Sequence, residues 1–281
     1  MSTTNQVGSR QIAKKLGLSA LFLIATSLFF LGDHLNPGRD RIVATAISAA
    51  LLLGLTILLY RSKRFYKYWE VSFAFFTGSF GLFLAWNIPD SPLRVFGASM
   101  YTPQGVAVLK FFELLPLALV IIVLTKIVQG SLSPIYIQRG DLRSGLGLGF
   151  LLGFFILVVY LVLSWSTIDR AKAIAALPWL IIFAVSNAFF EELLIRGLFL
   201  KRYIALLGTA WALILSALCY GLFFLGVQAA VGPIPYSALV VILPLGLLYG
   251  FIMQRSDSIW GPVSIHAVVD LIFLLGVFAS I

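Results

Sequence analysis

The sequence predicts an all-α fold, a polytopic membrane helix bundle with eight or nine transmembrane helices. Hydrophobic residues make up 60% of the 281 residues and charged residues only 11%, whereas soluble domains carry about 25% charged residues. Nine apolar stretches approach the roughly 20 residues that a helix needs to cross the hydrocarbon core of a bilayer. They lie at 16–31, 42–60, 71–88, 106–127, 145–165, 173–200, 210–230, 236–253 and 258–281.

The first four stretches are predicted to form an N-terminal membrane region, residues 1–129. A polar, basic N-terminus precedes the first stretch and no small-residue cleavage site follows it, so we expect a retained helix rather than a signal peptide. Turn residues at 36–38 and 89–92 separate the helices of this region. Residues 61–69 mix basic and aromatic side chains, which is typical of an anchor at the lipid headgroups rather than of nucleic-acid binding.

The last five stretches are predicted to form a second membrane core, residues 130–281. A polar segment with Gly130, Pro134 and Gly140 marks the boundary, and a Gly-Pro-Ile-Pro turn at 232–235 separates two later helices. The single cysteine, Cys219, excludes an intrachain disulfide framework.

Basic residues are distributed unequally between the two sides that alternating helices define. If the N-terminus is cytoplasmic, the inside segments hold 13 of the 20 Lys and Arg residues, the outside segments hold six, and one is inside a stretch. The inside residues are Arg10, Lys14, Lys15, Arg61, Lys63, Arg64, Lys67, Lys126, Arg139, Arg143, Lys201, Arg202 and Arg255. Cytoplasmic loops carry an excess of Lys and Arg, so we expect the N-terminus inside. The net charge of +9 is therefore explained by the basic residues of the cytoplasmic loops, and we expect no nucleic-acid partner.

Two glutamates and an arginine interrupt the sixth apolar stretch. A charged side chain at the centre of a membrane helix costs at least about 2.5–3.5 kcal/mol. It is therefore expected only where it pairs with an opposite charge or has a function. Glu192 and Arg196 are four residues apart and share a helix face, which favours an ion pair. Glu191 lies about 100° around the helix from Glu192, so it is free to take a role other than this ion pair. The alternative is a purely structural pair, with Glu191 hydrogen-bonded to a neighbour.

Further polar residues lie at a matching depth. Asn187 is one turn before Glu191 on the same face, and His266 and Asp270 share a face of the last helix. At 1.5 Å per residue, Glu191 lies about 15 Å from the inner end of its helix, near Lys201. His266 and Asp270 lie about 12 and 18 Å from the inner end of theirs. We therefore expect these residues to line one cavity, although a single buried histidine is more often a core residue.

Three motifs on successive predicted helices resemble those of one family of membrane enzymes. They are Glu191-Glu192-x-x-x-Arg196, the segment 211–224, and His266-x-x-x-Asp270 after 259–262. In this combination they resemble the CAAX protease and bacteriocin-processing (CPBP, or Abi) family of intramembrane glutamate endopeptidases. The resemblance covers about 173–277, and loosely the segment from 138.

The resemblance implies peptide hydrolysis inside the membrane. Glu191 corresponds to the glutamate that activates a water, and Glu192 with Arg196 to a structural ion pair. His266 and Asp270 correspond to the pair that polarises the scissile carbonyl and stabilises its oxyanion. Hydrogen-bond donors aimed at a developing oxyanion account for much of such catalysis.

The middle motif departs from the family pattern. Tyr220 stands where the family has phenylalanine, and Phe224 stands where it has the histidine that helps the glutamate to hold and deprotonate the water. A phenylalanine ring neither exchanges a proton nor binds a metal, whereas the Tyr220 hydroxyl, one turn earlier on the same face, could position a water. A catalytic zinc usually requires three firm ligands. We therefore expect no metal and no cofactor, with Asn187, Tyr220 and Phe224 lining the cavity.

Two functions fit these residues. The first is an endopeptidase-like protein, weakly active or inactive because of Phe224, that acts as a membrane scaffold, assembly factor or complex subunit. The alternative is an active intramembrane endopeptidase that cleaves prenylated or leader peptides, with Glu191 as the water-activating base. A transporter would show internal repeats or broken helices in paired halves, and the sequence shows none. We expect a prokaryotic plasma-membrane protein whose partners are lipid and either a peptide or protein substrate or a membrane-protein complex.

Overall fold

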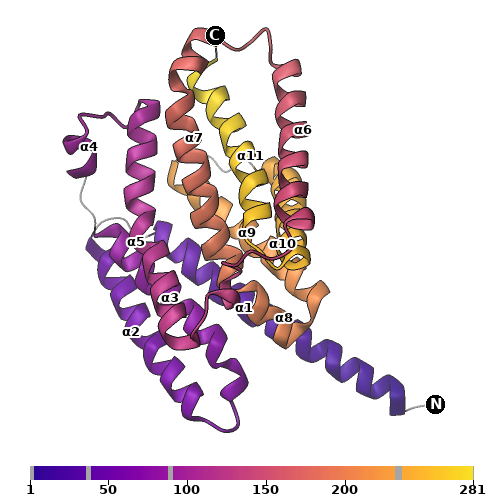
Figure 1. The fold of residues 1–281 in the computed structure, drawn as a ribbon. Coiled ribbons are helices and arrows are strands. Elements are labelled where there is room, and N and C mark those ends of the chain that lie inside the picture. The colour runs from indigo at the N-terminus through magenta and orange to yellow at the C-terminus, as the bar shows by residue number, and fades with distance from the viewer. Residues whose placement is uncertain (1–2, 36–38, 88–90, 232–235, 281) are drawn as a thin grey trace.

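The described chain is helical apart from turns and one isolated bridge between Ile168 and Ser280. The computed structural model describes residues 3–35, 39–87, 91–231 and 236–280. Its α-helices are α1 (Thr3–Leu35), α2 (Arg39–Arg61), α3 (Trp69–Trp86), α4 (Ser91–Val95), α5 (Pro103–Gln129), α6 (Leu148–Leu163), α7 (Arg170–Glu192), α8 (Leu200–Leu207), α9 (Thr209–Val231), α10 (Leu239–Ser256) and α11 (Trp260–Phe278). Figure 1 shows them as one bundle, in which α7 lies beside α11. The turns predicted at 36–38, 89–90 and 232–235 lie outside the described residues.

Within those residues, eight helical segments are long and apolar enough to cross a membrane. They are Gln11–Leu28, Ile42–Arg61, Pro103–Gln129, Arg143–Leu163, Arg170–Leu207, Thr209–Gly226, Leu239–Ser256 and Trp260–Phe278. The predicted all-α membrane bundle is therefore confirmed, and the chain is an integral membrane protein. The third predicted stretch, 71–88, corresponds to α3, which is not among the eight because Glu70 and several small polar residues lower the hydropathy of that helix.

The sixth predicted stretch is not one continuous α-helix. Helix α7 ends at Glu192, a π-helical turn follows at Leu193–Gly197, and α8 begins at Leu200. The amide of Leu198 donates to the carbonyl of Leu193, five residues back, at 3.0 Å. Such π-bulges are frequent at functional sites, and this one starts directly after the paired glutamates.

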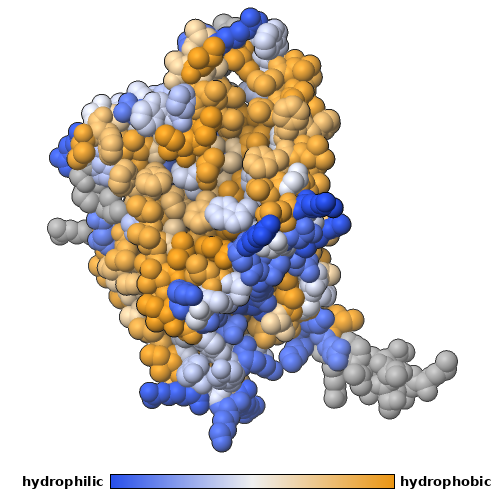
Figure 2. Space-filling model, viewed as in Figure 1, coloured by the Kyte–Doolittle hydropathy of each residue, from blue (hydrophilic) through white to orange (hydrophobic). Residues whose placement is uncertain are grey.

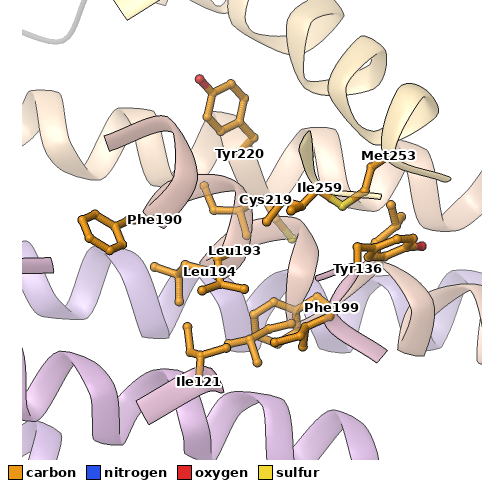
Figure 3. Close-up of a cluster of buried hydrophobic side chains, with 14 of the residues drawn as sticks. Ile121, Tyr136, Phe190, Leu193, Leu194, Phe199, Cys219, Tyr220, Met253 and Ile259 are labelled. Atoms are coloured by element: carbon orange, nitrogen blue, oxygen red, sulfur yellow. The ribbon is translucent and has the colours of Figure 1, made fainter. Parts of the chain in front are cut away.

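One hydrophobic core joins the N-terminal and C-terminal helices. Figure 3 shows Leu193 and Leu194, from the π-helical turn, lying among side chains of other elements. Ile121 of α5 belongs to the same core as Met253 of α10, and both side chains are fully buried. The predicted division between 1–129 and 130–281 stays a prediction, and both parts contribute to this core.

On one side of the bundle, contacts join the start of α8 and the segment around Tyr136 to the residues just before α11. Lys201, at the start of α8, forms an ion pair with Asp257 between its Nζ and Oδ1 atoms at 2.6 Å. The amide of Ile259, just before α11, donates to the carbonyl of Tyr136 at 3.0 Å. Burial, with the Asp257 carboxylate nearby, raises the pKa of the Tyr136 hydroxyl above its usual value. These contacts hold the start of α8 close to the start of α11.

The surface carries the apolar belt of a membrane protein. Figure 2 shows a broad apolar area on the visible face, with hydrophilic residues gathered at its two ends. Leu51 of α2 and Leu163 of α6 are 70% and 77% exposed. Soluble monomers rarely expose large contiguous apolar patches, so this belt is the surface that contacts lipid.

Candidate active site

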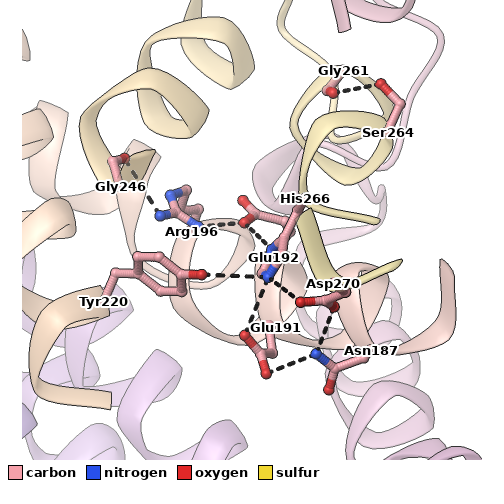
Figure 4. A network of polar contacts seen from close by, with 10 residues as sticks. All are labelled: Asn187, Glu191, Glu192, Arg196, Tyr220, Gly246, Gly261, Ser264, His266 and Asp270. Carbon is pink, nitrogen blue, oxygen red and sulfur yellow. Dashed lines mark hydrogen bonds and ion pairs between the residues drawn. The ribbon is translucent and has the colours of Figure 1, made fainter. Parts of the chain in front are cut away.

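Helices α7 and α11 pack side by side and bring four polar side chains together (Figure 4). His266 of α11 faces Glu191 of α7, with 3.5 Å between Nε2 and Oε2. The same Nε2 atom is 3.6 Å from Oδ1 of Asp270, one turn further along α11. The structure thus brings Asn187, Glu191, His266 and Asp270 together.

Asn187 bridges the two outer carboxylates. Its Nδ2 atom donates to Oε1 of Glu191 at 3.0 Å and to Oδ2 of Asp270 at 2.9 Å. A primary amide has two N–H groups, so one side chain uses both to hold groups that repel each other when both are ionised. Its buried Oδ1 atom has no hydrogen-bond partner among the described residues.

The inner carboxylate, Glu192, is held between an arginine and the histidine. Nη1 of Arg196 lies 2.5 Å from Oε1 of Glu192, and both side chains are completely buried. Nδ1 of His266 lies 2.9 Å from the same Oε1 atom. An ionised carboxylate only accepts hydrogen bonds, so Nδ1 carries the proton in this contact. Glu192 thereby fixes the ring of His266, whose Nε2 atom faces Glu191 and Asp270.

Two tyrosines complete the surroundings of His266. The Tyr220 hydroxyl of α9 lies 3.3 Å from Nε2 of His266. The ring of Tyr249, on α10, stacks on the imidazole with 5.2 Å between centroids and 17° between planes. The guanidinium of Arg196 lies 4.6 Å from the Tyr220 ring centroid and 5.2 Å from that of Tyr249, within cation–π range.

Sequence reasoning missed Tyr249 and Gly246. Both lie on α10, in an apolar stretch without polar spacing to mark them. Nη2 of Arg196 donates to the Gly246 carbonyl at 3.4 Å. A Cβ atom at Gly246 would come within 3.1 Å of the Ala217 backbone, so a glycine lets α10 approach α9 closely. The only feature of the sequence that could have indicated this close approach is a glycine, Gly246, between two leucines.

Phe224 does not join the polar cluster. It lies half-buried on α9, one turn after Tyr220. No hydrogen bond or ring contact within the described residues joins Phe224 to Glu191 or His266. The structure therefore gathers the polar residues expected to line the site, and the expected place of Phe224 in the cavity stays a prediction.

The side chains of the site are buried to different extents. The side chains of Glu191 and Asp270 are 14% and 18% exposed, whereas that of His266 is 2% exposed. A substrate group or water would therefore meet the outer carboxylates first, with the edge of the imidazole behind them. In the described parts of the chain, no group of three or more His, Cys, Asp or Glu side chains has the arrangement of a metal site.

Comparison with protein-family models gives one match. Residues 173–272, 100 of the 281, match the model described as Type II CAAX prenyl endopeptidase Rce1-like. The matched segment contains every residue of the polar cluster, so the resemblance drawn from the three motifs is confirmed there. A search of curated proteins and a search of solved structures found no match. Over residues 173–272 the chain is therefore similar to the CPBP type of intramembrane endopeptidase.

Proposed function

We propose that this Rce1-like membrane protein has little or no peptidase activity and acts as a membrane scaffold, assembly factor or complex subunit. The observation that carries the proposal is Phe224, which stands where the family has its water-holding histidine. The Tyr220 hydroxyl, one turn earlier on the same helix face, is directed at His266. At position 224 Glu191 therefore lacks the histidine with which the family holds a water.

The contacts of Glu191 support the same conclusion. One carboxylate oxygen accepts a hydrogen bond from Asn187, and the other faces Nε2 of His266. A general base must reach the proton that it abstracts within hydrogen-bond distance or through one water. Here each oxygen already faces one protein group, so a water would share the carboxylate with Asn187 and His266.

Asp270 weakens the oxyanion site. When ionised, a carboxylate accepts hydrogen bonds and donates none. Oxyanion stabilisation requires donors aimed at the developing negative charge. An ionised Asp270 therefore leaves His266 as the donor from this pair, and it places a negative charge where negative charge would develop.

Active hydrolysis is the second candidate, and the partial exposure of Glu191 and Asp270 favours it. In this function Glu191 activates a water, while His266 polarises the scissile carbonyl of a prenylated or leader peptide. The Tyr220 hydroxyl would position the water in place of the missing histidine.

A turnover assay separates the two functions. We expect the purified native chain, reconstituted in liposomes, to cleave prenylated and leader peptides no faster than the Glu191→Gln variant. Both proteins should co-purify with the same membrane-protein partner, because a scaffold does not need the base. Cleavage by the native chain that Glu191→Gln abolishes would overturn the scaffold proposal and establish the peptidase.

We further propose that the chain lies in a prokaryotic plasma membrane with its N-terminus in the cytoplasm. The excess of Lys and Arg in alternate segments supports this orientation. Tyr66 and Tyr101 are exposed on segments that the proposal places on opposite sides. In a Cys219→Ala background, an impermeant maleimide should label Tyr101→Cys in intact cells and Tyr66→Cys only after permeabilisation. The reverse pattern would show that the N-terminus is outside.

A further inference from the structure

A large apolar cavity lies between α1, α2 and α3 and shares no lining residue with the polar cluster. Its volume is about 830 Å³. The lining residues are Leu18, Leu21, Phe22, Ala25, Leu28, Ala44, Thr45, Ser48, Leu51, Leu52, Leu55, Leu59, Tyr68, Val71, Ser72, Phe75, Ser79 and Leu82. No charged side chain is among them, and the polar groups are hydroxyls.

The cavity exists because α1 and α2 follow each other in the chain but pack on different partners. Helix α1 packs against α9, and α2 packs against α3. Phe22 of α1 stacks on Tyr203 of α8 with 5.0 Å between centroids, and the Cys219 thiol of α9 donates to Thr26 at 3.4 Å. The cavity opens onto the outer surface of the bundle, because its lining residues Leu28 and Leu51 are 72% and 70% exposed. In a bilayer, an apolar recess of this kind is filled by an apolar molecule.

The dimensions of the cavity fit the tails of a phospholipid. If each methylene takes about the 30 Å³ that a water takes in the liquid, the cavity holds roughly 28 such groups. The lining on α2 runs from Ala44 to Leu59, about 22 Å at 1.5 Å per residue. This length exceeds one half of a hydrocarbon core that is about 30 Å thick.

One end of the cavity lies beside a concentration of positive charge. Leu59 and Tyr68 line that end, and we call the residues between them the basic loop. Its basic side chains, all exposed, are Arg61, Lys63, Arg64 and Lys67. Within the described residues none of them forms an ion pair with a protein carboxylate. Basic clusters next to membrane helices attract anionic lipid headgroups.

We infer that the cavity binds one anionic phospholipid, with its tails between α1, α2 and α3 and its phosphate at the basic loop. The apolar lining favours binding of the hydrocarbon tails. The four positive charges of the basic loop favour an anionic headgroup. A zwitterionic lipid would gain the same burial but less from the four positive charges. The sequence indicated only a general headgroup anchor at 61–69; the adjoining cavity turns it into a site for a single molecule.

The inference is tested by native mass spectrometry of the full chain, purified and offered phosphatidylglycerol and phosphatidylcholine with identical tails. We expect one retained lipid per protein, with phosphatidylglycerol favoured by about tenfold. Replacing all four basic residues of the loop by Gln should abolish the preference, and Lys63→Gln with Arg64→Gln should lower it. Arg139→Gln with Arg143→Gln removes two exposed charges elsewhere and should leave it intact. Equal retention of both lipids by the native chain, or a preference that survives the loop substitutions, overturns the headgroup assignment.

A second set of variants tests the position of the tails. Ser48→Phe fills the cavity from α2, and Leu51→Trp, one turn further along, does so independently. Each should abolish retention of both lipids while size-exclusion elution and helix content stay native. Ile47→Phe is the matched control, because this exposed residue does not line the cavity. Unchanged lipid retention in a folded cavity variant, or a retained hydrocarbon without a phosphate, overturns the site.

Discussion

Arg196→Ala is expected to lower the free energy of unfolding by about 3–5 kcal/mol, as when one partner of a buried ion pair is removed. Arg196 is completely buried, pairs with Glu192, donates to the Gly246 carbonyl and lies over two tyrosine rings. Its loss leaves the fully buried Glu192 without its cationic partner and with His266 as its remaining contact. Reversible unfolding in mixed detergent micelles measures the change.

A double variant separates the charge from the packing. Glu192→Gln retains an oxygen to accept from Nδ1 of His266, and Arg196→Met fills much of the space of the arginine stem. Replacing both members of a buried pair by neutral groups of similar volume is often close to neutral. We therefore expect the double variant to recover most of the loss, and the exposed Arg139→Ala to have no effect. An Arg196→Ala protein as stable as the native chain would show that the pair does not stabilise the fold.

Phe224→His is expected to raise peptide turnover by about 10²–10⁴-fold over the native chain, the usual contribution of a positioned acid or base. The substitution restores the side chain that the family uses beside Glu191, one turn from Tyr220 on α9. A turnover assay with prenylated and leader peptides measures the gain. Adding Glu191→Gln should remove it, because the new histidine needs the carboxylate to share the proton.

Phe223→His is the matched control for this gain. It introduces the same side chain at the adjacent residue, about 100° around α9, and should leave turnover at the native level. Equal gains from both variants would show that the effect is not local to the site. Substantial cleavage by the native chain, unchanged by Phe224→His, would show that Phe224 does not silence the protein.

The sequence by itself determined the class of the protein and the helix faces on which its polar residues lie. Composition and the length of the apolar stretches predict a helical membrane protein, because a bilayer requires about 20 apolar residues per span. Helical periodicity placed Asn187 on the face of Glu191, and His266 on the face of Asp270. These are properties of single helices, so they follow from spacing along the chain.

The tertiary structure decided which of these faces meet and what surrounds them. The bridge from Asn187 to Asp270 spans 83 residues, and the contact between Tyr220 and His266 spans 46. Tyr249 reaches His266 from a helix with no polar pattern. The lipid-sized cavity arises because α1 packs on α9 rather than on α2. Spacing along one helix says nothing of such contacts, because they depend on which helices pack together and at what rotation.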